Sequence, residues 1–173
     1  MATSRFHLAL SSGQAYQVAM NRVQFLQFVP NGIRAIGTQN LDGCTVVAIV
    51  SHFATILAHI PPLPYPTPDP NVGMANLRTQ MATVLALYDQ NRALFPAGTT
   101  SLVVGATIEG GIALDHQITY VRQTLVQRQL IHHFAVYPVT MGGHGTSAQG
   151  TVFIDARQGQ RTPEVYVEDR RVI

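Results

Sequence analysis

The sequence predicts an α+β fold, in which helices flank a β-sandwich or mixed-sheet core in α/β/β layers. Most of the chain consists of short runs with the alternating apolar pattern of strands, while two stretches have the apolar spacing of amphipathic helices. In addition, the hairpin pattern over residues 44–60 is apolar on both faces. Strands buried on both faces belong in the middle of a layered structure. The length of 173 residues suits one domain, which we expect to span 1–173.

The first part of the chain predicts strands at 5–10, 22–29 and 33–37, with a turn signal at 30–32. Two β-rich runs, 45–50 and 54–60, then predict a hairpin. Residues 61–70 contain six prolines and therefore cannot continue a ladder or a helix. They predict a stiff polyproline connection to the next helix. A lid beside His59, or a docking segment for a proline-binding partner, is the alternative.

The remainder of the chain predicts two main helices and four strands. The first helix begins at Gly73 and carries one apolar stripe of Met74, Leu77, Met81, Val84, Leu85 and Tyr88. The second runs to about Leu130, with a stripe of Leu114, Ile118, Val121 and Leu125. Strands are predicted at 101–107, 133–139, 151–156 and 164–168, and a flexible loop at 141–150. The total is roughly eight strands and two helices.

The composition restricts the surface and the environment of the protein. Charged residues make up only 12% of the chain, about half the usual share, so we expect polar uncharged faces or an apolar patch covered in a homo-oligomer. All basic residues other than histidine are arginines, and the chain contains no lysine. A GC-rich genome is the first explanation for this bias. A toxin-like or effector-like protein that avoids ubiquitination in another cell's cytosol is the second explanation.

Several classes of partner are not expected. The arginines are scattered, and the only adjacent pair, Arg170-Arg171, is too small for a nucleic-acid-binding stripe. No run approaches the roughly 20 apolar residues of a membrane span, and the N-terminus lacks a segment of signal-peptide length. We therefore expect a protein without a membrane span, located in the cytoplasm or delivered to a target-cell cytosol.

Cys44 and His59 are the first candidates for chemistry. Cys44 is the only cysteine, so it cannot form an internal disulfide, and it follows Gly43 at the start of the hairpin. A two-residue hairpin loop places Cys44 opposite His59, and a four-residue loop makes them diagonal neighbours, about 5–8 Å apart at Cβ in either case. A three-residue loop places them on opposite faces. The pair is a candidate nucleophile and base, with the Gly43 and Cys44 amides as oxyanion donors. A buried, inert thiol is the alternative.

These residues also resemble a known enzyme group. Thr38, Leu41-Asp42-Gly43-Cys44 and His59 are similar to the Leu-Ser-Gly-Cys…His signature of the cytotoxic necrotizing factor catalytic domain. The Thr–Cys–His order is also similar to that of bacterial chemoreceptor glutamine deamidases. The resemblance covers about residues 36–60 and departs at Asp42, where the toxin pattern has Ser. It implies a single deamidase-like domain, a β-sandwich with flanking helices, and a role for Thr38 in orienting the imidazole.

Together, the residues and the resemblance predict a cysteine-dependent amidohydrolase that deamidates a protein glutamine through a thioester. An amine that intercepts the thioester would lead to transamidation. Asp155 is a further candidate, as an acidic third member. The reaction needs no metal or organic cofactor, and the expected partner is a glutamine-bearing protein. The alternative is an inactive deamidase-like fold that serves as a protein-interaction or ligand-binding module.

Other motifs give weaker signals. His132, His133 and His144 are residue types that bind zinc, but neighbouring residues on a strand point to opposite faces, so a metal site is not expected. The chain has no Gly-x-Ser-x-Gly motif, and its glycine-rich stretches lack the Lys-Ser/Thr ending of a phosphate-binding loop. Serine-hydrolase chemistry and nucleotide binding are therefore disfavoured.

Overall fold

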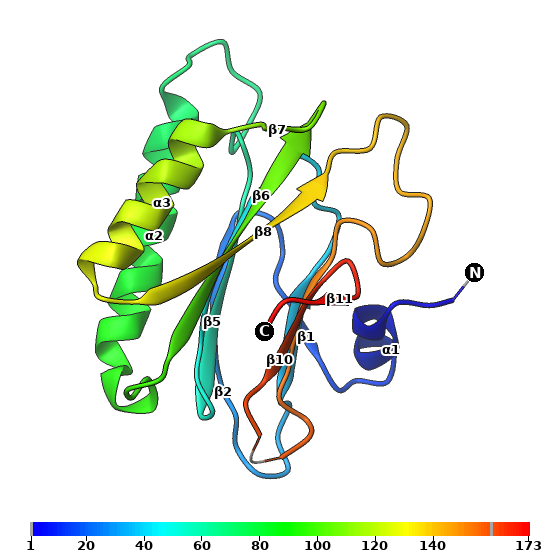
Figure 1. The fold of residues 1–173 in the computed structure, drawn as a ribbon, viewed down its shortest axis with the longest axis vertical. Helices are drawn as coiled ribbons and strands as arrows, with labels where there is room; N and C mark the ends of the chain where they lie inside the picture. Colours follow the sequence, from blue (N-terminus) through cyan, green and yellow to red (C-terminus); the bar gives the residue numbers. More distant parts are fainter. Residues whose placement is uncertain (1, 160) are drawn as a thin grey trace.

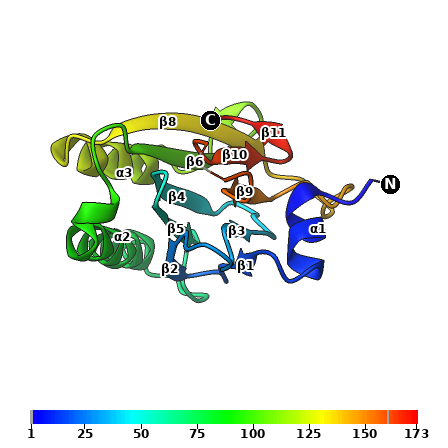
Figure 2. The same cartoon turned by 90° about the horizontal axis from the view of Figure 1, so that it is seen from below.

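Two β-sheets pack face to face in the computed structural model, which describes residues 2–159 and 161–173 (Figure 1). Two long helices cover the outer face of one sheet, and a short helix lies beside the other sheet (Figure 2). The helices are α1 (Arg5–Ser11), α2 (Val72–Gln90) and α3 (Asp115–Gln127), with a short 3-10 turn, η1, at Arg92–Leu94. The predicted α+β fold with α/β/β layers is confirmed.

The sheet beneath the long helices contains the hairpin. Its order is β2-β5-β4-β6-β7, and β8 also pairs with β6, the one parallel pairing among these strands. All residues of β4 and β5 are buried, as expected for central strands that are covered on both faces. The bounds are β2 (Arg22–Gln27), β4 (Thr45–Val50), β5 (Ala54–Ile60), β6 (Thr100–Ile108), β7 (Gly111–Ile112) and β8 (Ile131–Pro138).

The second sheet is smaller and joins segments from both ends of the chain. Its order is β1-β3-β9-β10-β11, with β1 parallel to β3 and the other pairs antiparallel. The bounds are β1 (Tyr16–Gln17), β3 (Ala35–Thr38), β9 (Val152–Asp155), β10 (Glu164–Val167) and β11 (Arg170–Arg171). Because β3 lies in this second sheet, its last residue can contact a residue of β5 across the interface between the two sheets.

Apolar residues fill two main layers of the core. Between the sheets, the alternating residues Val46, Ala48 and Val50 of β4 pack with Leu57 of β5 and with Ile36, Val152 and Ile154 of the second sheet. On the other face, Val47, Ile49, Ile56 and Ala58 pack against Leu77, Met81 and Val84 of α2 and against Ile118, Val121 and Leu125 of α3. The predicted helical stripes therefore do cover the sheet. No helix in the described part of the chain is long and apolar enough to cross a membrane.

The strand predicted at 5–10 is wrong, because this segment forms α1. The Ser4 side chain caps the helix by accepting the backbone N–H of His7 at 3.2 Å, and Phe6 and Ala9 are buried three residues apart on one face. A run this short satisfies both the strand period and the helix period. Gly37 of β3 makes room for the helix, because a Cβ there would lie 2.5 Å from Cδ2 of Phe6.

The other predicted strands and helices are present, with ends that differ by a few residues. The two-residue strands β1, β7 and β11 were not predicted, because two residues carry no measurable alternation. The 61–70 segment connects β5 to α2 and contains no helix or strand, as predicted from its prolines.

Candidate functional site

The hairpin register places Cys44 and His59 on the same face of the sheet. Val50 pairs with Thr55 and Val46 pairs with His59, which is the register of a four-residue loop. Cys44 immediately precedes β4, and it packs with Val46 in the core between the two sheets. Of the three alternatives that the sequence left open, the structure therefore has the one in which Cys44 and His59 are diagonal neighbours.

A hydrogen bond across the sandwich fixes the His59 ring. Thr38 ends β3 in the opposite sheet, and its Oγ1 lies 2.7 Å from Nδ1 of His59. The same hydroxyl donates its only proton to the Val18 carbonyl oxygen at 2.8 Å, and a carbonyl oxygen can only accept. The Thr38 oxygen must then accept from Nδ1–H. This assigns the proton of the neutral ring to Nδ1 and leaves the lone pair on Nε2.

The other ring nitrogen of His59, Nε2, makes no hydrogen bond in the described part of the chain. This nitrogen is also buried. Buried polar atoms in folded proteins are nearly always paired, so an unpaired one calls for an explanation. One such explanation is that Nε2 accepts a proton during a reaction. A general base requires an unprotonated nitrogen of this kind.

We predict that Thr38→Val lowers the free energy of unfolding by about 1–3 kcal/mol, although it changes the side-chain volume little. The substitution leaves Nδ1–H of His59 and the carbonyl of Val18 without their buried partner. Urea unfolding at pH 7 measures the loss, and Thr38→Ser, which keeps the hydroxyl, is the matched control. Equal destabilisation by both substitutions would show that the methyl group, rather than the hydrogen bond, matters.

Both candidate catalytic groups are neutral in the resting fold. His59 is only 2% exposed, and burial lowers its pKa to about 4. Cys44 is 3% exposed, and burial raises the pKa of its thiol. The backbone amide of Asp42 opposes this rise, and the Asp42 carboxylate adds to it, although that side chain is exposed. The pair is therefore a thiol beside an unprotonated imidazole, not a preformed thiolate–imidazolium pair.

Tyr137 belongs to the same cluster and was missed from the sequence. This β8 residue is fully buried, and its hydroxyl donates to the carbonyl oxygen of Cys44 at 2.8 Å. Burial and the nearby Cys44 and Asp42 raise the pKa of the phenol, while the amides of Gly43 and Cys44 act in the opposite direction. The phenol thus lies beside the two amides assigned as oxyanion donors. A buried tyrosine needs a partner for its hydroxyl, but no local pattern reveals a partner 93 residues away.

The Gly43 backbone explains why a glycine precedes Cys44. Its φ is +83°, in the left-handed region that side chains disfavour. The chain turns here into β4, and Pro62 packs close by, because a Cβ on Gly43 would lie 3.4 Å from Cγ of Pro62. The proline-rich segment therefore begins directly beside the Cys44 loop.

Asp155 does not reach the Thr38–His59 pair. It pairs with Ala35 at the far end of β3, while Thr38 pairs with Val152. Ile154 faces the core between the sheets, so Asp155 points to the other face, where it binds Arg157 at 2.7 Å. This ion pair and the backbone amide of Arg157 lower the pKa of Asp155, against the effect of burial. The structure does not support its role as a third member of the site.

The histidines that were weighed as metal ligands lie apart from this site. Nε2 of His132 accepts a hydrogen bond from Nε of Arg122 at 3.0 Å, whereas the ring of His144 packs over Gly150. In the part of the chain that the structure describes, no three His, Cys, Asp or Glu side chains are grouped closely enough to hold a metal ion.

Comparison with known proteins gives no family for this chain. No protein-family model matches the sequence, and no curated protein matches it either. The geometry of Thr38, Cys44 and His59 is therefore the guide to function.

Proposed function

We propose that this protein is a cysteine-dependent amidohydrolase that converts a protein glutamine side chain to glutamate. The Thr38–His59 hydrogen bond is the observation that carries the proposal. It fixes the imidazole in the tautomer of a general base, on the sheet face that His59 shares with the thiol of Cys44. An inert core histidine would have no need of an unpaired Nε2.

The reaction proceeds in two halves. Nε2 of His59 takes the thiol proton while Sγ of Cys44 attacks the carboxamide carbon, and the Gly43 and Cys44 amides bind the oxyanion. The carbon–nitrogen bond breaks, and His59 returns the proton to the leaving ammonia. His59 then takes a proton from water, which attacks the thioester, and the carboxylic acid leaves as the thiol reforms. An amine in place of water gives transamidation.

The neutral resting pair determines when the proton moves. Because burial favours the uncharged form of both groups, a thiolate–imidazolium pair is unfavourable before the substrate binds. Proton transfer therefore accompanies the attack on the substrate. The hydroxyl of Thr38 stabilises the imidazolium that forms, because it remains an acceptor for Nδ1–H.

Substrate access requires a movement beside Gly43. Cys44 and His59 are almost completely covered, and Pro62 packs on the Cys44 loop. Outside the helices and strands, residues 61–66 form no backbone hydrogen bond with other described residues, and the carbonyl oxygen of Pro62 packs against Gly73. A glutamine on a protein surface would displace the part of this segment that begins at Pro62, which is only partly buried.

The burial of Cys44 favours the second candidate function. A covered thiol with a raised pKa, beside a carboxylate at Asp42, is also expected of a deamidase-like fold that has lost activity. Such a chain would serve as a protein-interaction or ligand-binding module.

Alkylation of the thiol separates the two candidates. We expect iodoacetamide, which itself carries a carboxamide, to alkylate Cys44 in the folded chain at pH 6–7, as followed by mass spectrometry. His59→Ala should slow this reaction at least about tenfold, because the base is lost. His116→Ala, at an exposed position, is the matched control. A thiol that reacts only in denaturant would support the binding module.

A further inference from the structure

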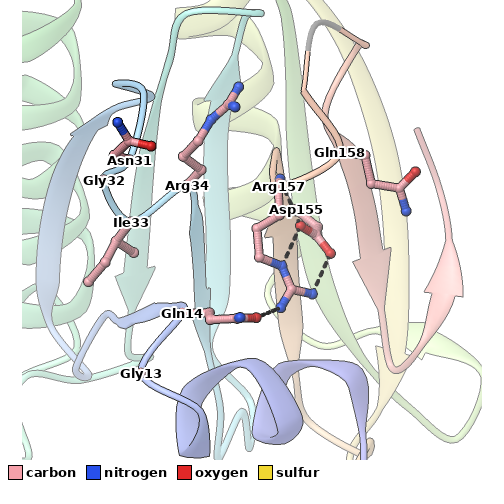
Figure 3. Close-up of a pocket in the computed structure, with 9 residues that line it drawn as sticks. All are labelled: Gly13, Gln14, Asn31, Gly32, Ile33, Arg34, Asp155, Arg157 and Gln158. Atoms are coloured by element: carbon pink, nitrogen blue, oxygen red, sulfur yellow. Dashed lines mark hydrogen bonds and ion pairs between the residues drawn. The ribbon is translucent and has the colours of Figure 1, made fainter.

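A groove of about 570 Å³ lies at the end of the sandwich opposite Thr38 (Figure 3). Arg34, which lines it, immediately precedes β3, whereas Thr38 ends that strand, roughly 13 Å farther along at ~3.3 Å per residue. The volume falls within the range of about 300–1,000 Å³ that is typical of small-molecule sites. The groove is thus separate from the proposed catalytic residues, and its function does not depend on them.

One of the two arginines in the groove is already neutralised. Arg157 donates to Asp155 through Nε at 2.9 Å and through Nη2 at 2.7 Å, and through Nη1 to Gln14 at 2.6 Å. This bidentate pair contributes no net charge, and three of the five N–H donors of the Arg157 guanidinium are used in these bonds. Asp155 therefore does not repel an anion in the groove.

Arg34 is the arginine without an acidic partner. Its Nη2 donates to the carbonyl oxygen of Gly159 at 3.2 Å, which leaves the positive charge uncompensated, and no described carboxylate pairs with it. Its Nε is buried and has no hydrogen-bond partner within the described ranges. A partly buried guanidinium normally has an anionic partner, since it loses solvation without one.

Side-chain amides line the same groove as this charge. Gln14 uses its oxygen to accept from Arg157, so its NH₂ group is free to donate. Asn31 and Gln158 also line the groove, and in Figure 3 they lie on opposite sides of the two arginines. Ile33 adds an apolar surface. The lining thus offers one positive charge, several amide donors and a short apolar wall.

We propose that this groove binds a small molecule with an oxyanion head, either a carboxylate or a phosphate, and a short apolar body. The anion pairs with the Nη groups of Arg34 and accepts from the amide of Asn31, which lies toward the same end of the groove (Figure 3), while the body lies along Ile33. The planar guanidinium group can bind either a carboxylate or a phosphate through two parallel hydrogen bonds. The residues that line the groove therefore fit both oxyanions.

The test is a titration of the intact chain with inorganic phosphate and, separately, with butyrate, with sodium chloride at equal ionic strength as the reference. We expect a saturable rise in Tm with phosphate or butyrate, and NMR shifts of the side-chain amides of Gln14, Asn31 and Gln158. Arg34→Gln should weaken the apparent affinity at least about tenfold. Arg22→Gln, at an exposed arginine, is the matched control and should have no effect.

Three results would overturn the proposal. They are the absence of a saturable response to either probe, a response that Arg34→Gln leaves unchanged, and NMR shifts confined to residues outside the groove. If Arg34→Gln does not fold, Asn31→Gly takes its place, because this exposed side chain has no hydrogen bond to lose among the described residues and its φ of 61° suits glycine. Unchanged affinity in that variant, with no shift of the Asn31 amide in the wild-type chain, would also refute the site.

Discussion

Replacement of Cys44 by alanine is expected to abolish deamidation, with a loss on the order of 10⁴-fold or more. The first covalent step of the proposed reaction forms the bond between the sulfur and the amide carbon, and without that thioester the second step has no substrate. The chain is incubated with a library of glutamine-containing peptides, and mass spectrometry with an ammonia assay follows conversion of the amide to the acid. Since this is the only cysteine, no second thiol can replace it.

The control must separate chemistry from folding. Cys44 lies in the core between the sheets, so its removal costs a small amount of packing, about 1 kcal/mol. Thr45→Ser removes one methyl group from the adjacent buried residue and should leave activity unchanged. If the wild-type chain releases no ammonia, or if Cys44→Ala releases as much as the wild type, the thiol mechanism is wrong. An inactive wild type would leave the interaction module as the better explanation.

The relation between Cys44 and His59 was predictable only up to one number, the loop length of the hairpin. The apolar runs located β4 and β5, but each added loop residue moves every side chain of one strand to the other face. Residues 51–54 have no turn signature that selects one register. The structure settles this with the pairing of Val50 and Thr55.

Sequence patterns could not predict which residues contact each other across long separations in the chain. The hydroxyl of Thr38 meets His59 because β3 and β5 lie in different sheets that pack face to face, an arrangement that periodicity does not encode. Only the family resemblance suggested a role for Thr38. Tyr137 of β8 contacts Cys44 within one sheet, but across a sequence separation that no motif spans.

Two errors have local causes. The segment at 5–10 is short enough to fit either period, and the Ser4 cap decides in favour of the helix. Asp155 is acidic and lies in the same sheet as Thr38. Because side chains alternate along a strand, however, it points away from the core between the sheets and toward Arg157. Residue type alone could not distinguish these faces.

Acid should destabilise the folded chain mainly through His59. Burial lowers the pKa of His59 from 6.5 to about 4. Between these values the unfolded chain binds a proton that the folded chain cannot yet take, so the free energy of unfolding falls as the pH falls from 6.5 to about 4. Above about pH 7 neither state binds this proton, and the contribution of His59 to stability is complete. The difference between the two pKa values corresponds to roughly 3 kcal/mol.

Urea unfolding at pH 7 and at pH 4.5 measures this effect, and His59→Gln should remove most of the difference between the two pH values. His116→Gln, at an exposed position, should retain it. Asp155 also loses stabilisation in acid, since its pKa is lowered in the folded chain, but it contributes equally in all three proteins and cancels from the comparison. An unchanged pH dependence in His59→Gln would mean that the folded chain takes up the proton at His59 without cost. In that case the ring would not be the sealed, unprotonated base that the proposed attack by Cys44 requires.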